Sequence, residues 1–165
     1  MVTPSLPKLF RERATEKLSP KLGEELIWDK CDMDALSCLR IPSDSQEGFD
    51  LEVHVNISDI SIFAGGRARM DFMLHGNQEE LVNNVINTIC DLLSPKMRIR
   101  VELSQDTPVY WYIELNNNNQ WEIKEKVLML SWKVSKYVNY FRNKKSEKIY
   151  QNNRLPVPGS SEANV

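Results

Sequence analysis

Alternating apolar and polar residues in the first half of the chain predict strands. Residues 49–57 read FDLEVHVNI, in which every second residue is apolar. Because successive side chains of a strand point to opposite faces, this pattern is typical of a strand with one buried face. Residues 35–41 form a shorter apolar run, ended by the turn-forming residues PSDSQEG. The AGG at 64–66 predicts a tight hairpin between residues 60–63 and 67–74.

Three more strands are predicted in the second half of the chain, over residues 97–103, 109–115 and 121–130. The connections between them, SQDTP and NNNN, are short and polar, as in antiparallel hairpins. Asparagine is a common turn residue, so the run of four needs no further function.

The triplet Tyr110-Trp111-Tyr112 lies in the second of these strands, and the period of two predicts which ring faces the core. It places Trp111 inward, and in the next strand it places Trp121 and Ile123 inward. The opposite face then gathers cationic, aromatic and acidic side chains: Arg98, Arg100, Glu102, Tyr110, Tyr112 and Glu114.

Apolar residues recur at the helical period in two segments. Over residues 78–93 they form one stripe, which predicts a helix. Asn77 is the expected N-cap, and Ser94-Pro95 marks the end of the helix. In KVSKYVNYFRNKK they follow the i, i+3, i+4, i+7 spacing, which predicts a second helix over about 133–145. Basic residues in its last turn suit the negative end of the helix dipole.

Strands joined mainly by hairpins, with helices in separate places, predict an α+β fold with an antiparallel sheet of about six strands. Residues 31–155 are predicted to form this single domain, with the helix at 78–93 on one face of the sheet. Residues 1–30 are polar with short apolar intervals. Leu9, Phe10, Arg13 and Leu18 could form a brief helix that ends at Ser19-Pro20, and we expect an extension that docks loosely or not at all. Folding should not require residues 1–25, and residues 156–165 are predicted to be a disordered tail.

The charge of the chain is balanced overall but unevenly distributed. The 21 lysines and arginines against 23 aspartates and glutamates leave a formal net charge of −2, so nucleic acid and anionic lipid are not strongly attracted. Residues 31–130 hold 16 acids and 8 bases, whereas residues 131–165 hold 7 bases and 2 acids. The basic C-terminal end is therefore the main electrostatic feature of the sequence.

The composition predicts a cytoplasmic protein that does not enter a membrane. No apolar run approaches the roughly 18 residues of a membrane helix. The first residues lack the apolar stretch of a secretory signal. The three cysteines are odd in number and lack C-x-x-C spacing, which disfavours a disulfide framework and agrees with a reducing compartment.

Sequence motifs for catalysis, metal binding and cofactor binding are missing. No two of the potential metal ligands have the usual close spacing; they are Cys31, Cys38, Cys90, His54 and His75. There is no G-x-S-x-G motif, and AGGR is interpreted as a hairpin turn instead of a phosphate-binding loop. We therefore expect a protein that is not an enzyme and that holds no metal or cofactor.

Two groups of residues are candidates for binding a partner. The sheet face with Arg98, Arg100, Tyr110 and Tyr112 combines cations and aromatics, as platforms for single-stranded nucleic acid do. The acids on the same face favour another interpretation, in which the arginines meet carboxylates across strands. The basic run FRNKKSEKIYQNNR is either a solvated helix end or a site for nucleic acid, anionic lipid or an acidic protein. Its candidate residues are Arg142, Lys144, Lys145 and Lys148.

The succession LLSPKMRIRVEL, TPVYWYIEL and FRNKKSEKIYQNN resembles a group of small, mostly uncharacterised bacterial α+β proteins, over residues 49–155. No established activity comes with that group, and small bacterial proteins of this size often neutralise toxins or act as adaptors. The resemblance, the separated charge and the lack of catalytic spacing favour a non-enzymatic protein-interaction domain of the immunity or adaptor kind. The alternative is a nucleic-acid-binding module that uses the basic C-terminal segment and the Arg/Tyr face.

Overall fold

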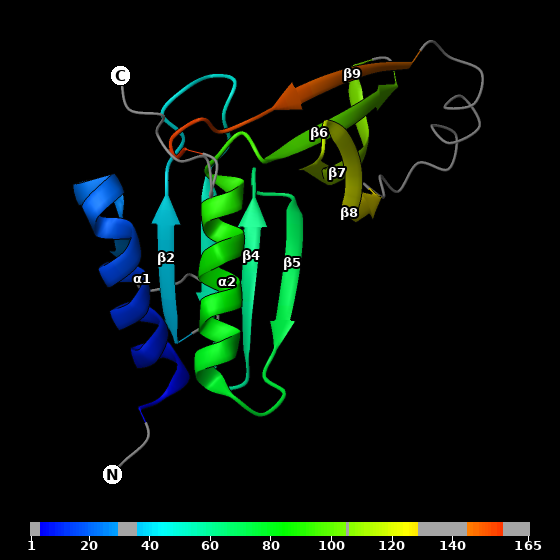
Figure 1. Cartoon of the computed structure of the whole chain (residues 1–165). Coiled ribbons are helices and arrows are strands. Elements are labelled where there is room, and N and C mark those ends of the chain that lie inside the picture. Colours follow the sequence, from blue (N-terminus) through cyan, green and yellow to red (C-terminus); the bar gives the residue numbers. More distant parts are fainter. Residues whose placement is uncertain (1–3, 30–35, 105, 129–144, 157–165) are drawn as a thin grey trace.

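The computed structural model describes residues 4–29, 36–104, 106–128 and 145–156, and its strands form two antiparallel sheets (Figure 1). Sheet A has the strand order β1-β2-β3-β4-β5, with β1 (Ile27–Asp29), β2 (Ser37–Ile41), β3 (Leu51–Val55), β4 (Asp59–Ala64) and β5 (Ala68–Met73). Sheet B has the order β8-β7-β6-β9, with β6 (Met97–Ser104), β7 (Thr107–Asn117), β8 (Gln120–Leu128) and β9 (Lys145–Tyr150).

The predicted α+β class and the antiparallel pairing are confirmed, but the single sheet of about six strands is wrong. The first sheet ends at β5, and after α2 (Gln78–Leu92) the chain starts a second sheet instead of pairing β6 with β5. Alternation in a strand tells which face is buried and not which strand lies beside it. The sequence pattern therefore fits one sheet and two sheets equally well.

The two helices lie on one face of sheet A, side by side (Figure 1). Helix α2 begins at the predicted N-cap, where the side-chain oxygen of Asn77 accepts a hydrogen bond from the Glu79 N–H at 2.9 Å. Its buried stripe faces the sheet and consists of Val82, Val85, Ile86, Ile89 and Leu92. This helix confirms the prediction made from the apolar period of residues 78–93.

The N-terminal helix α1 (Leu6–Leu22) contradicts the expectation of a loosely docked extension. Six apolar side chains of this helix are buried in the common core. Five of them recur at every fourth position, and Leu9 is the sixth: Leu6, Leu9, Phe10, Ala14, Leu18 and Leu22. Most of the remaining positions are charged and none of them is apolar except the prolines, so the stripe is narrow and easily overlooked. Pro7 lies in the first turn, where its missing N–H has no helical partner to lose.

One continuous core joins the helices, the inner face of sheet A and the inner face of sheet B. The sheets approach each other at the turn between β4 and β5. A Cβ on Gly65, whose φ is +60°, would lie 3.0 Å from the Trp111 ring and 3.4 Å from Ile99. Only a residue without a side chain therefore lets the turn of sheet A lie against Trp111 of sheet B.

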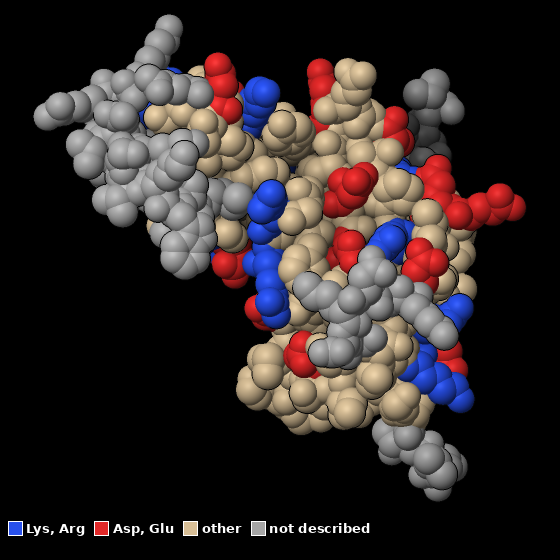
Figure 2. Space-filling view, turned by 180° about the vertical axis from the view of Figure 1, so that it is seen from behind, with Lys and Arg blue, Asp and Glu red and all other residues tan. Residues whose placement is uncertain are grey.

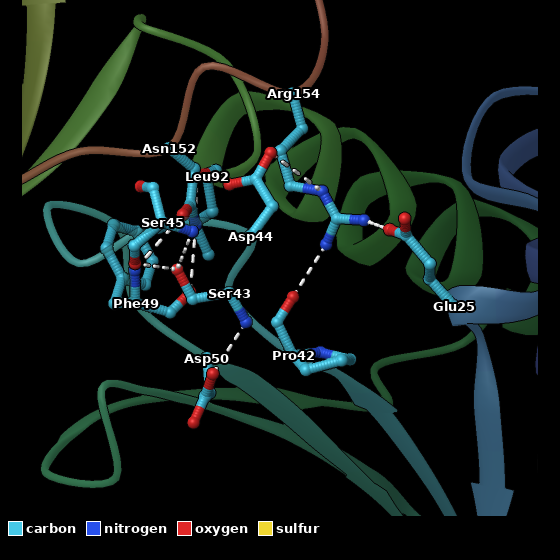
Figure 3. A network of polar contacts seen from close by, with 10 residues as sticks. All are labelled: Glu25, Pro42, Ser43, Asp44, Ser45, Phe49, Asp50, Leu92, Asn152 and Arg154. Atoms are coloured by element: carbon cyan, nitrogen blue, oxygen red, sulfur yellow. Dashed lines mark hydrogen bonds and ion pairs between the residues drawn. The ribbon is translucent and has the colours of Figure 1, made fainter.

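The segment after β9 connects the loop between β2 and β3 to the end of α2 (Figure 3). The fully buried Asn152 amide donates to the carbonyl of Phe49 at 3.0 Å and to that of Leu92 at 3.3 Å. Its Oδ1 accepts from the Phe49 N–H at 3.1 Å. The side chain thus satisfies backbone groups of two distant elements that would otherwise be buried without partners.

The charged side chain of Arg154 makes further contacts between the same segments (Figure 3). Its guanidinium forms an ion pair with Glu25 and donates to the Pro42 carbonyl at 2.7 Å. Its backbone N–H donates to the Leu93 carbonyl at 2.9 Å. The last part of the basic C-terminal run is therefore built into the fold.

We predict that Phe10→Ala lowers the free energy of unfolding by about 3–5 kcal/mol, because it removes a large side chain from a packed core. Thr15→Ala, at an exposed position of the same helix, should change it by less than about 0.5 kcal/mol. Denaturant titrations give both values. Deletion of residues 1–25 should likewise unfold the domain, and an unchanged denaturation midpoint after deletion would contradict the position of α1.

A second prediction isolates the contact between the sheets. Gly66 has φ +69° and no atom within 4 Å of an added Cβ, so Gly66→Ala should cost only the backbone strain, about 1 kcal/mol. Gly65→Ala has the same strain plus the overlap with Trp111 and should cost roughly 1–3 kcal/mol more. Equal stabilities of the two variants would show that the sheets do not meet there.

Candidate protein-interaction surface

The outer face of sheet B, which is turned away from the core, carries the Arg/Tyr face expected from the sequence. Cross-strand pairing sets Arg98 opposite Glu114, Arg100 opposite Tyr112 and Glu102 opposite Tyr110. Trp111 lies on the other face, packed against the core and stacked on Tyr150 at 6.5 Å between ring centroids. The predicted facing of Tyr110-Trp111-Tyr112 is confirmed.

The predicted inward facing of Trp121 and Ile123 is wrong. A bulge shifts the β7–β8 register, so that Ile113 pairs with Glu125 whereas Glu114 pairs with Ile123. One extra residue in a strand reverses the facing of all residues beyond it. Trp121 therefore lies on the outer face, where the Arg98 guanidinium is 3.9 Å from its ring centroid.

The centre of this outer face is an ion-paired network around Glu114. The Glu114 carboxylate is buried and accepts hydrogen bonds from the Nε atoms of Arg98 and Arg100, both at 2.7 Å. Arg100 also donates to Glu147 at 2.8 Å. The expectation that these arginines meet carboxylates across strands is confirmed. Burial alone lowers the pKa of Arg100, but the bonds and charges of Glu114 and Glu147 hold that pKa above its ordinary value.

The tyrosines of the face are held in the same network. The Tyr112 hydroxyl donates to Glu102 at 2.9 Å, and the Arg100 guanidinium lies 4.0 Å from its ring centroid. The Lys126 ammonium lies 4.1 Å from the Tyr110 ring centroid. Cations thus already cover one side of each ring, which leaves less ring surface for stacking bases.

Exposed apolar side chains lie beside this network. They are Ile123 at 53% exposure, Leu128 at 38% and Ile149 at 49%. Their strand partners are Glu114, Tyr110 and Arg100, so all three point to the outer face. The surface therefore combines a paired, partly buried polar centre with an apolar border.

The basic residues expected to bind a partner are separated by the fold. Lys145 lies on β9, 3.3 Å from Glu102 of the outer face. Lys148 pairs with Val101 and so belongs to the opposite face of the sheet. Arg142 and Lys144 lie outside the described residues. The predicted helix over 133–145 does too, apart from Lys145, which begins a strand instead.

One group of metal-ligating side chains was missed by the sequence reasoning. Within the described ranges, Cys38, Glu52 and His54 are the three residues close enough together to hold a metal ion. They lie on the face of sheet A that is turned away from α1 and α2, the side from which Figure 2 views the molecule. Their separation in sequence hides them, but the β2–β3 hairpin pairs Cys38 directly with His54. Pairing the two predicted strands through their PSDSQEG turn is the signal that could have found them.

Comparisons with protein-family models, curated proteins and solved structures find no match for this chain. Among the described elements, neither helix is both long and apolar enough to cross a membrane. The geometry of the surface itself is therefore the basis for a functional assignment.

We predict that Glu114→Gln destabilises the domain by about 3 kcal/mol, because it leaves two partly buried guanidinium groups without their shared countercharge. Glu122→Gln on the neighbouring strand is the control. Glu122 is exposed, so its replacement should have an effect below about 0.5 kcal/mol. Similar denaturation midpoints for both variants would show that the network does not organise the face.

Proposed function

We propose that the domain is a non-enzymatic protein-binding module of the immunity or adaptor kind, and that the outer face of sheet B is its docking surface. One observation carries the proposal: the exposed side chains of Ile123, Leu128 and Ile149 border a network of arginine, tyrosine and tryptophan. These polar and aromatic residue types are enriched at the centres of protein interfaces.

The pairing within the network supports a protein partner. Glu114 and Glu147 already balance the charges of Arg98 and Arg100, so covering these two arginines with another protein leaves neither of them without a countercharge. The same pairs hold the long arginine side chains in place before binding. Less conformational entropy is then lost on association.

The charge at the edge of the surface indicates the chemistry of the partner. Lys126 and Lys145 are exposed on the outer face, with Glu147 as an exposed acid. The sequence that connects β8 to β9, residues 129–144, contains four bases and no acid. We therefore propose a folded partner whose apolar patch is bordered by acidic side chains, which would also speed association.

A cytoplasmic location is part of this proposal. The Cys90 thiol is free, which fits a reducing compartment. Burial raises the pKa of the Cys90 thiol, so this group is a poor nucleophile at neutral pH.

The alternative of nucleic-acid binding rests on the same outer face, where cations and aromatic rings lie side by side. Against it stand Glu102, Glu114 and Glu147, which occupy the arginine, lysine and tyrosine groups that would contact phosphates and bases. The acids also repel a phosphate backbone. Protein binding is therefore favoured.

The docking proposal predicts which substitutions abolish partner binding. The tagged domain is used to enrich partners from a lysate of its source organism, and the best candidate is then purified. Ile123→Glu and Ile149→Glu should each lower its affinity at least about tenfold, since they place a charge in the apolar border. Met73→Glu changes a comparably exposed side chain on sheet A and should leave affinity unchanged. If only Met73→Glu lowers the affinity for the partner, the interface does not lie on the outer face of sheet B.

A salt titration tests the nucleic-acid alternative. With a labelled single strand and a labelled duplex, we predict weak, sequence-indifferent binding that disappears by about 0.15 M salt, as for exposed charges alone. Replacing Arg142, Lys144, Lys145 and Lys148 with Ala should remove even this binding. Submicromolar affinity that survives physiological salt would reverse the ranking of the two functions.

A further inference from the structure

We propose that Cys38, Glu52 and His54 form a binding site for a divalent transition metal, with zinc as the best match to their donor atoms. A thiolate, an imidazole nitrogen and a carboxylate oxygen are the three ligand types that proteins use for zinc. Harder ions such as Mg²⁺ prefer all-oxygen sites. The site lies on the face of sheet A that is turned away from α1 and α2, so it is separate from the proposed docking surface on sheet B.

The donor atoms converge on one point. They all lie within 4.8 Å of one another. Glu52 Oε1 is 2.5 Å from His54 Nε2 and 3.5 Å from Cys38 Sγ. Around a tetrahedral zinc with bonds of about 2.0–2.3 Å, ligand atoms are roughly 3.3–3.7 Å apart. Small side-chain rotations therefore bring the present arrangement to zinc geometry.

The sheet holds these ligands in place. Cys38 and His54 are directly paired across β2 and β3, and both are buried. The His54 ring packs on Phe63, with 4.7 Å between centroids. Arg40 Nε lies 3.6 Å from Glu52 Oε2, which leaves Oε1 turned toward the thiol and the imidazole. Such outer contacts orient ligands at metal sites.

The charges of the site also fit a divalent ion. A Cys38 thiolate and the Glu52 carboxylate together balance two positive charges. The nearby Arg40 has its own countercharge in Asp29, at 3.9 Å.

Metal binding has a defined proton balance. The ion accepts lone pairs from Sγ, Nε2 and Oε1. The Cys38 thiol proton passes to solvent, and the proton that Nε2 donates to Glu52 without metal is replaced, by exchange with solvent, with a proton on Nδ1, so that the imidazole stays neutral. Glu52 is partly exposed, so water can fill the fourth ligand position. Without metal, the same three groups form the hydrogen-bonded cluster already described.

The test uses the full, reduced, metal-free chain titrated with Co²⁺, whose thiolate complexes absorb in the near-ultraviolet. We expect one equivalent of Co²⁺ to give this band, and Zn²⁺ to displace it. Cys38→Ser should abolish the band, and His54→Gln should lower Zn²⁺ affinity at least about tenfold. Cys90→Ser and Cys31→Ser are the matched controls and should retain the band.

Stability gives a second readout in case Cys38→Ser does not fold. Zn²⁺ should raise the melting temperature of the original chain and of Cys90→Ser, and should raise that of His54→Gln clearly less at the same Zn²⁺ concentration. The proposal is overturned if Co²⁺ gives no thiolate band, or if the band persists in Cys38→Ser and disappears in Cys31→Ser or Cys90→Ser. Either result leaves the docking surface on sheet B untouched.

Discussion

The outer face of sheet B depends on the ion pairs that the Glu114 carboxylate forms with two arginines. The carboxylate is buried between Arg98 and Arg100, at 2.7 Å from each, and together with Glu147, which pairs with Arg100, it balances the charge of the two cations. With one guanidinium on Trp121 and the other on Tyr112, the same arginines also fix the aromatic rings. The cations at the centre of the face are thereby held by acidic groups, and exposed apolar side chains lie beside them.

The rest of the fold holds that face in position relative to sheet A. Helix α1 completes the core from one side, Gly65 lets the β4–β5 turn touch Trp111, and Asn152 connects the β2–β3 loop to the end of α2. Each of these contacts joins segments far apart in the sequence. Sheet B is thus supported by sheet A and the helices, while its outer face takes no part in the core.

The sequence pattern predicted the features that depend only on neighbouring residues in the chain. Strands such as Leu51–Val55 and the capped helix Gln78–Leu92 follow from periodicity, as does the facing of Trp111. Other features depend on tertiary pairing, which periodicity does not record. The bulge that turns Trp121 outward and the register that joins Cys38 to His54 are examples. The stripe of α1 was missed because charged residues surround a narrow line of apolar positions.

The central claim is that the outer face of sheet B binds a protein. Methyl NMR of the labelled domain, titrated with its purified partner, tests this claim most directly. We expect the methyl signals of the exposed Ile123 and Ile149 to shift or broaden at stoichiometric partner, while that of Met73 on sheet A stays unchanged. Perturbation of Met73 with no change at Ile123 and Ile149 would contradict the account.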